Sequence, residues 1–393
     1  MKTALRFLRF RHMQLLGILF MLIGCQVKPN LIPFTVEEEL FDQDELDDLG
    51  LDTLSGTQTI TIYAADSLND HYCNGVVMTS FKGMLFCQWQ SSQDDEDAPD
   101  TWVAYSKSND GEQWSKPAIL VPSIKDGYCS SGGWWTCNDT LIAYIHVWPV
   151  SVKPRGGYTF YTKTGDGIHW SNLEPVLMAN GDTMRAVIEQ DPKVLASGRM
   201  ICAAHFQPGL VVSPIYTDDR SGVRGWSRAN FNNLSVDNNV SREIEPSSFV
   251  RKDSALVMVF RDQKSSYKKL ASISLDEGAN WSTPILTNMP DSRTKQSAGN
   301  LPDGSCYLVG NPVDGKRRSP LVLTLSEDGH CFNKAFVLRK GGKTLPKLEY
   351  EGKYKRVGYH YPKSMVWQNY LYVSYATNKE RVEFTRVPLS SLK

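Results

Sequence analysis

Three histidines and one tyrosine are the residues of this chain best suited to acid–base chemistry: His71, His146, His205 and Tyr216. A histidine titrates near neutral pH and can take or give a proton, and a phenol can donate one to a leaving oxygen. The histidines lie beside apolar runs that are typical of strands. A histidine beside a strand also commonly makes only structural hydrogen bonds, so both interpretations stay open at these positions.

Cationic and aromatic side chains supply candidates for binding a ligand. Arginine pairs with carboxylates through its planar guanidinium, and tyrosine adds a hydroxyl. Two adjacent tryptophans after a pair of glycines form either a platform for stacking on a sugar or part of the buried core. The candidate binding residues are Arg220, Arg224, Arg261, Tyr267, Trp134 and Trp135. Each arginine and tyrosine could instead close a contact between strands.

A repeated motif indicates which elements would position these residues. Ser108-Asn-Asp110-Gly111-Glu-Gln-Trp114 recurs with variations, and the five copies start 52 to 57 residues apart. Each copy lies between two short apolar runs, which predicts a strand, a tight turn and a strand. The hydroxyl and carboxylate can accept turn amides, glycine takes the positive φ, and the aromatic ring packs between sheets. The copies start at Ser108, Thr164, Thr217, Ser274 and Ser326.

A repeat of this length holds about four strands, which is the size of one propeller blade. The segment Thr57–Lys393 therefore predicts one all-β domain, a β-propeller of six or seven blades. Its last two strands, near 370–375 and 382–387, are expected to close the ring against residues near 57–63. The motif resembles the Asp-box of sialidase-like (BNR) propellers, in which the box is a folding element. None of the Asp-box acids is therefore assigned to catalysis.

Sialidase chemistry itself is not expected. A sialidase needs three arginines around the sugar carboxylate, a Tyr–Glu pair and an Asp acid, with the first arginine early in the first blade. Here no arginine occurs between Arg11 and Arg155. Glu245-Pro-Ser and Phe260-Arg261-Asp-Gln resemble surviving parts of that machinery, which would leave Arg261 to read a carboxylate.

Several segments resemble a narrower branch of these propellers, the ulvan lyases and the α-L-rhamnosidases that act on rhamnosyl-α-1,4-glucuronate. The matching stretches are His71-Tyr-Cys-Asn-Gly, Gln88-Trp-Gln-Ser-Ser, Ser130-Ser-Gly-Gly-Trp-Trp, His205-Phe-Gln-Pro-Gly, Arg293-Thr-Lys-Gln-Ser-Ala-Gly-Asn and 359–362. The resemblance implies degradation of an acidic plant or algal polysaccharide. In the hydrolytic route of this branch, one histidine near the chain start, on the other propeller face, replaces two carboxylates, and His71 matches it.

Hydrolysis of the rhamnosyl bond is the preferred interpretation, because His71 is present. A lyase would instead neutralise the uronate carboxylate and use a base and an acid, for which His, Tyr and Arg are sufficient. A non-catalytic glycan-binding propeller is the third hypothesis. The partner expected in every case is an acidic polysaccharide or oligosaccharide.

The first residues predict export and lipid attachment. Four basic residues precede an apolar run that ends in Leu22-Ile-Gly-Cys25, which resembles the lipoprotein processing signal of bacteria. We therefore expect a signal peptide over 1–25, lipidation at Cys25 and a place in the cell envelope, by default the outer membrane. The nine acids between Glu37 and Asp52 are expected to form a solvated tether over 26–56.

Charge and cysteine content narrow the partners and cofactors. Lys plus Arg and Asp plus Glu both number 43, which argues against a nucleic-acid binder, and the segment from Thr57 onward carries about +4, which suits an anionic ligand. The seven cysteines after Cys25 include a possible Cys129–Cys137 disulfide. No cofactor is predicted, although structural calcium, for example in the acidic loop 94–100, or zinc is possible.

Overall fold

The computed structural model describes residues 31–188 and 190–392, and the fold is that of the unit Ile32–Lys393. The predicted signal peptide and the lipidation site Cys25 lie outside the described residues. Within the described ranges there is no helix long and apolar enough to cross a membrane.

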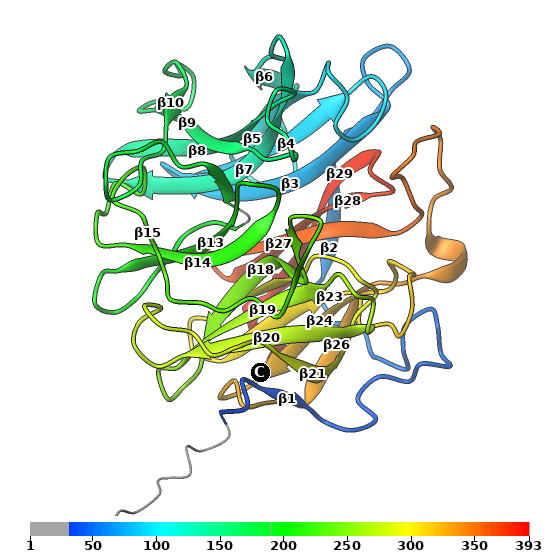
Figure 1. Ribbon diagram of the computed structural model, residues 1–393. Helices are drawn as coiled ribbons and strands as arrows, with labels where there is room; N and C mark the ends of the chain where they lie inside the picture. Colours follow the sequence, from blue (N-terminus) through cyan, green and yellow to red (C-terminus); the bar gives the residue numbers. More distant parts are fainter. Residues whose placement is uncertain (1–30, 189, 393) are drawn as a thin grey trace, which may run out of the picture. The chain divides into compact units, whose positions relative to one another are not determined.

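Six antiparallel sheets follow one another around a ring and form a six-bladed β-propeller (Figure 1). The all-β prediction is confirmed, and the blade number is the lower of the two expected. Blade 1 consists of β3 (Tyr72–Phe81), β4 (Met84–Ser92), β5 (Trp102–Ser108) and β6 (Ala118–Val121). Blade 2 consists of β7 (Gly127–Cys137), β8 (Thr140–Pro149), β9 (Tyr158–Thr164) and β10 (Glu174–Pro175). Blade 3 consists of β11 (Ala186–Ile188), β13 (Met200–Phe206), β14 (Val211–Thr217) and β15 (Ser227–Arg228), with β12 (Lys193–Val194) also paired to β13.

The remaining blades complete the ring, and the last one takes its outermost strand from the N-terminal side. Strand β2 pairs with β29 from Gln58–Arg386 to Ala64–Arg381, which confirms the predicted closure. Blade 4 consists of β18 (Glu243–Val250), β19 (Leu256–Asp262), β20 (Lys268–Ser274) and β21 (Ile285–Pro290). Blade 5 consists of β22 (Ser297–Asn300), β23 (Cys306–Gly310), β24 (Leu321–Ser326) and β26 (Lys334–Arg339). Blade 6 consists of β27 (Tyr359–Trp367), β28 (Tyr370–Thr377), β29 (Arg381–Pro388) and β2 (Gln58–Ala64). Short elements are β1 (Thr35–Val36), β16 (Val236–Asp237), β17 (Val240–Ser241), β25 (Cys331–Phe332), η1 (Gly342–Thr344) and η2 (Leu389–Leu392).

Each Asp-box forms the turn after the third strand of its blade, as predicted. In the first copy the Asp110 carboxylate accepts the backbone N–H groups of Glu112 and Gln113, both at 2.8 Å. Gly111 has φ +75°, and its N–H donates to the Ser108 hydroxyl. The degenerate third copy ends in Trp226, which is fully buried between blades 2 and 3. The Asp-box carboxylates therefore stabilise the turns through hydrogen bonds to backbone N–H groups.

The described part of the predicted tether, residues 31–56, is not solvated chain but packs on the propeller, which corrects the sequence interpretation. Strand β1 pairs with β25 in parallel, and Phe34 packs edge-on against Phe249 and Phe332. Phe34, Val36, Phe41 and Leu49 are buried in the core of blades 4 and 5, and Leu54 is buried in the core of blades 5 and 6. The acidic side chains between them are exposed or partly exposed. The many acids made the segment look fully solvated, although its apolar residues are buried.

The seven cysteines within the described residues are free, which decides the open question about a disulfide. Cys129 and Cys137 lie on the same strand, β7, eight residues apart. An extended strand separates them by about 26 Å, far beyond disulfide reach.

Candidate active site

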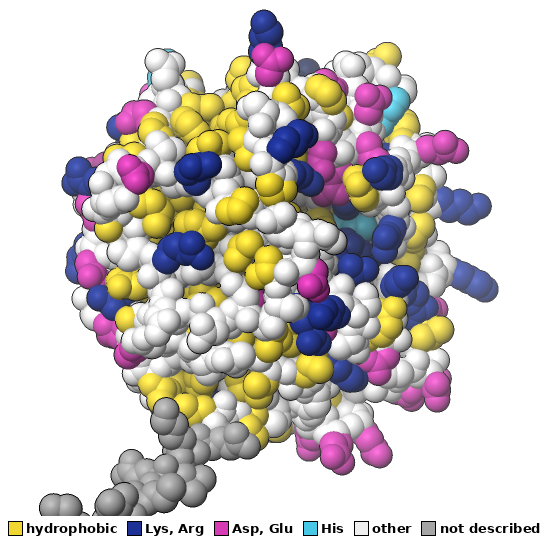
Figure 2. Space-filling view, viewed as in Figure 1, with side chains coloured by type: hydrophobic (Ala, Val, Ile, Leu, Met, Phe, Trp, Pro, Cys, Tyr) yellow, Lys and Arg dark blue, Asp and Glu magenta, His cyan; other side chains and the backbone are white. Residues whose placement is uncertain are grey.

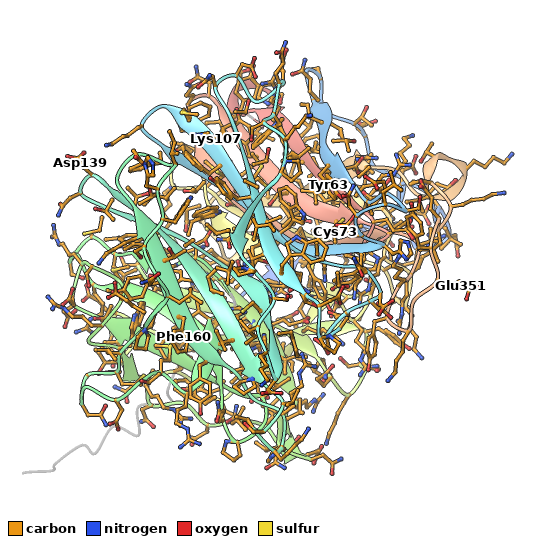
Figure 3. All side chains as sticks on the ribbon, turned by 90° about the horizontal axis from the view of Figure 1, so that it is seen from above. Tyr63, Cys73, Lys107, Asp139, Phe160 and Glu351 are labelled. Atoms are coloured by element: carbon orange, nitrogen blue, oxygen red, sulfur yellow. The ribbon has the colours of Figure 1, made fainter. Side chains whose placement is uncertain are left out.

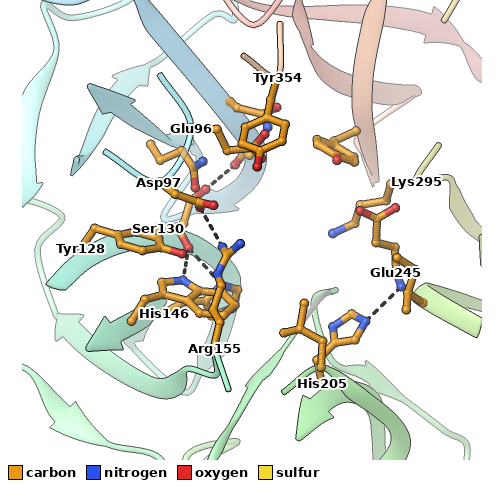
Figure 4. A pocket seen from close by; sticks show the side chains of 18 of the residues that line it. Glu96, Asp97, Tyr128, Ser130, His146, Arg155, His205, Glu245, Lys295 and Tyr354 are labelled. Atoms are coloured by element: carbon orange, nitrogen blue, oxygen red, sulfur yellow. Dashed lines mark hydrogen bonds and ion pairs between the residues drawn. The ribbon is translucent and has the colours of Figure 1, made fainter. Parts of the chain in front are cut away.

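A cavity of about 390 Å³ lies at the hub of the propeller, and all six blades contribute to it (Figure 4). Its lining mixes cations, carboxylates, histidines and aromatic rings, which is the composition of a site for a polar ligand. The lining residues are Asn74, Gly75, Gln90, Glu96, Asp97, Tyr128, Ser130, Ser131, His146, Trp148, Arg155, His205, Leu210, Ile244, Glu245, Arg261, Gln263, Lys295, Tyr354, Tyr361 and Lys363. We call it the central pocket.

Irregularities in the innermost strands aim these side chains into the pocket. The ladder of each of four blades shifts register at the pocket, between 74 and 77, 131 and 133, 244 and 247, and 360 and 363. A bulge bends a strand and re-aims its side chains. Glu245 and Tyr361 sit at these bulges with φ of 53°, in the left-handed region that non-glycine residues rarely adopt.

An aromatic wall supports His146 on one side of the pocket. The Ser130 hydroxyl lies 3.3 Å from His146 Nδ1 and accepts a hydrogen bond from the Trp148 indole at 2.9 Å. The Tyr128 and Trp148 rings stack at 5.8 Å, and the Arg155 guanidinium lies over both. The wall fixes the imidazole plane and places an arginine beside it.

Asp97 faces the pocket from the loop between β4 and β5. Its carboxylate pairs with Arg155 at 2.7 Å, and its φ is 68°. Burial raises the pKa of Asp97 above its ordinary value, and Arg155 opposes that rise only in part. Its neighbour Glu96 pairs with Lys379 at 2.5 Å. Asp97 is therefore a carboxyl group that keeps its proton to higher pH than an exposed aspartate does.

Glu245 lies across the pocket from Asp97 (Figure 4) and is held by Arg261. Arg261 Nη1 lies 3.1 and 3.0 Å from the two carboxylate oxygens, and both side chains are mostly buried. Burial lowers the pKa of Arg261, but Glu245, Tyr361 and Asp291 together more than compensate and raise it overall. His205 Nε2 accepts the backbone N–H of Glu245 at 3.2 Å, so this nitrogen carries no proton in this arrangement.

Lysines add positive charge at the pocket. Lys295 and Lys363 are both almost fully buried, and Lys363 Nζ donates to the Gly132 carbonyl at 3.3 Å. The half-buried Asp191 carboxylate accepts the Trp134 N–H at 2.7 Å. Desolvation raises the pKa of Asp191, and Lys363, Lys295 and Lys193 oppose that rise. On the face shown in Figure 2, Lys and Arg side chains gather around a hollow in the right half.

Comparison with known proteins places the fold in a family. A family model described as "BNR repeat-like domain" matches residues 83–373. The chain belongs to this BNR repeat-like family. Among curated proteins no match is found.

Solved structures similar to this BNR propeller share its fold at low identity. They include a sialidase (TM-score 0.55, 19% identity, 91% of this chain and 35% of that one), a protein of unknown function from Dyadobacter fermentans (0.64, 15%, 85% and 100%) and the intramolecular trans-sialidase of Ruminococcus gnavus (0.60, 13%, 85% and 98%). The chain thus spans about a third of the first protein's length. At these identities the likeness establishes the propeller fold alone.

Three of the predicted site residues meet in the central pocket of this BNR protein: His146, His205 and Arg261. Blade 1 contributes amides and carboxylates, and among the described lining residues the arginines are Arg155 and Arg261. The arginine that sialidases carry early in the first blade therefore has no counterpart in this part of the pocket.

His71 lies in a separate, open cavity next to the central pocket. Its ring stacks on Tyr350 at 4.4 Å, and Asp94, Asp95 and Glu351 line the same cavity. Residues 94–95 line this cavity and 96–97 the central pocket, so the two share a wall. The expectation that His71 opens on the other propeller face is therefore wrong, because the β4–β5 loop brings it beside the same site.

The other predicted residues lie elsewhere. The Tyr216 ring is covered by the Arg199 guanidinium at 4.5 Å, and Tyr267 lies at a turn with φ of 56°. Arg224 is exposed and pairs with Asp219 of an Asp-box. The Arg220 carbonyl accepts the Trp135 indole N–H, and Trp134 is buried with its indole on the Val77 carbonyl. None of these residues lines the central pocket, and the core interpretation of Trp134 is confirmed.

The described residues hold no group of three or more His, Cys, Asp and Glu side chains that could ligate a metal. In the loop 94–100, Asp95 accepts backbone N–H groups of Glu96 and Tyr354, and Asp100 accepts that of Gln93. These acids therefore stabilise the loop, and the calcium interpretation gains no support.

Proposed function

We propose that this chain is an α-L-rhamnosidase that cleaves the L-rhamnosyl-α-1,4-D-glucuronate linkage of an acidic plant or algal glycan in its central pocket. The observation that carries the proposal is the arrangement of two carboxyl groups on opposite sides of a pocket that also holds four cations. A uronate carboxylate fits such a lining because cations compensate its charge away from bulk water. The cations are Arg155, Arg261, Lys295 and Lys363.

The common route of glycoside hydrolysis uses one protonated acid and one ionised carboxylate. Asp97 suits the acid, because burial raises its pKa and lets it donate a proton to the leaving oxygen. Glu245 suits the ionised partner, because Arg261 contacts both of its oxygens and stabilises the charge. This assignment differs from the single-histidine route, since His71 lies in the neighbouring cavity.

Elimination is the second candidate, and the histidines favour it. His205 lies on one side of the pocket, and His146 and Tyr128 lie across it (Figure 4). A neutral histidine can take the proton next to the uronate carboxylate, and a tyrosine can protonate the leaving oxygen. The cations would stabilise the charge that develops on the carboxylate.

One assay separates the candidates. The purified protein is incubated with a rhamnose-capped glucuronate oligosaccharide and with ulvan, and both free rhamnose and the ultraviolet absorbance of an unsaturated uronate are followed. Rhamnose without absorbance supports the hydrolase, and absorbance supports the lyase. Binding without either product would overturn the enzymatic proposal and leave a glycan-binding propeller.

We propose in addition that the chain is exported and anchored by lipid at Cys25. The support is the basic start, the apolar run and the Leu22-Ile-Gly-Cys25 sequence. In a bacterial host, Cys25→Ala should abolish incorporation of a labelled fatty acid and release the protein from the membrane fraction. Unchanged labelling would refute the lipidation site.

A further inference from the structure

Two further cavities form a groove across blade 3. One, of about 460 Å³, lies between the loop 151–154 and the end of β13, and the other, of about 370 Å³, lies between residues 178–185 and β15. Both are lined by Arg185 and Phe206. The two cavities therefore lie side by side on blade 3, with Arg185 and Phe206 between them, and we call them together the blade 3 groove.

The blade 3 groove begins at the edge of the central pocket. Residues 151–154 line the groove and the next residue, Arg155, lines the pocket. Phe206 lines the groove, and its neighbour His205 lines the pocket. The groove thus adjoins the central pocket along the chain, within the reach of a linear ligand that extends beyond the pocket on this side.

The groove is cationic. Its basic side chains are Lys153, Arg185 and Arg228, and its acid is Asp182, which accepts a hydrogen bond from the Asn180 amide. Within residues 31–188 and 190–392, none of the three cations is in an ion pair, although Arg185 contacts the Gln207 amide at 3.3 Å. The Arg228 guanidinium lies over the Phe206 ring at 4.3 Å, which holds it in place.

The opposite approach to the central pocket has the reverse charge. The cavity beside His71 is lined by Asp94, Asp95 and Glu351, against a single lysine, Lys353, among its described residues. Glu351 lies at the edge of the molecule far from the β7–β8 turn at Asp139 (Figure 3). An anionic chain is therefore attracted on the blade 3 side and repelled on the other side.

We infer that the blade 3 groove binds a second anionic group of the same glycan chain, a carboxylate or a sulfate, so that the substrate is a polyanion rather than an isolated rhamnosyl-glucuronate unit. This inference rests on the proposed function of the central pocket. Free guanidinium groups beside an aromatic ring are suited to such groups, because the ring can contact the sugar while the cations contact the anion.

The test compares long and short ligands on Arg185→Ala/Arg228→Ala. Its matched control is Lys116→Ala/Lys125→Ala, which removes two exposed cations of the loops flanking β6. Affinity is measured by titration calorimetry with a rhamnose-capped glucuronate disaccharide and with long-chain ulvan, and melting temperature confirms folding. We expect the groove variant to lose about tenfold or more in affinity for the polymer, less salt dependence, and no change on the disaccharide. The control should match the wild type.

Polymers that keep only carboxylates or only sulfates identify which group the groove binds. Equal losses on disaccharide and polymer, or no loss on the polymer, would overturn the inference, and so would a wild type that binds neither polymer. If the polymer binds through the groove but no product forms, the proposed function fails while the groove assignment stands. If product forms and the groove variant behaves as wild type, only the groove assignment fails.

Discussion

Replacing Arg261 with glutamine tests whether the central pocket binds a carboxylate group of the substrate. Arg261 is 13% exposed at its side chain and contacts both oxygens of Glu245. If its guanidinium also contacts the substrate carboxylate, Arg261→Gln removes a charge-assisted hydrogen bond of about 1.5–3 kcal/mol. Since 1.36 kcal/mol corresponds to a factor of ten, kcat/KM should fall about 10- to 150-fold.

The assay uses a matched pair of substrates, the acidic oligosaccharide and its carboxyl-reduced form. The loss should be larger on the acidic substrate than on its carboxyl-reduced form, because the neutral form loses only the support that Arg261 gives to Glu245. Breaking the pair with Glu245 also costs stability, about 3 kcal/mol for side chains that are mostly buried. Glu245→Gln/Arg261→Gln should recover part of that cost in denaturant unfolding. Equal losses on both substrates would refute carboxylate recognition and assign Arg261 to positioning Glu245.

Three further substitutions test the acid, the neighbouring cavity and the N-terminal segment. Asp97→Asn should lower kcat by about 10²–10⁴. The folded chain binds the Asp97 proton more tightly than the unfolded chain does, so the free energy of unfolding of the wild type should fall as pH rises from about 4 through the raised pKa. Denaturant unfolding at several pH values should show this fall for the wild type and not for Asp97→Asn. His71→Ala should leave cleavage of a short acidic oligosaccharide unchanged, and a loss of product release with intact folding would return His71 to the catalytic set. Phe34→Ala should cost about 3–5 kcal/mol in the free energy of unfolding, against little change for the exposed Leu46→Ala, and a null effect would support the tether.

The fold could be predicted from the sequence because the motif that indicates it is repeated and each copy spans only a few residues. Each Asp-box combines a hydroxyl, an acid, a glycine and an aromatic ring within a few residues, and each of the four has its expected partner in the turn. Ring closure was also predictable, since the last segment holds too few strands for a four-stranded blade and the first strand of the propeller, β2, supplies the missing one. The N-terminal segment was misread because nine acids between Glu37 and Asp52 outweighed five separate apolar residues that only tertiary packing brings together.

The site was harder to predict because backbone irregularity, not residue type, sets its geometry. Arg261 occupies a regular strand position beside an apolar run, and it was among the residues predicted for the site. Glu245 and Tyr361 reach the pocket through bulges with positive φ, and Asp97 through a loop residue with φ of 68°. No sequence period marks such positions, because a register shift reverses which face each following side chain takes. Four bulged blades therefore explain both why this pocket exists and why residue type alone assigned Tyr216 and Tyr267 to the site instead.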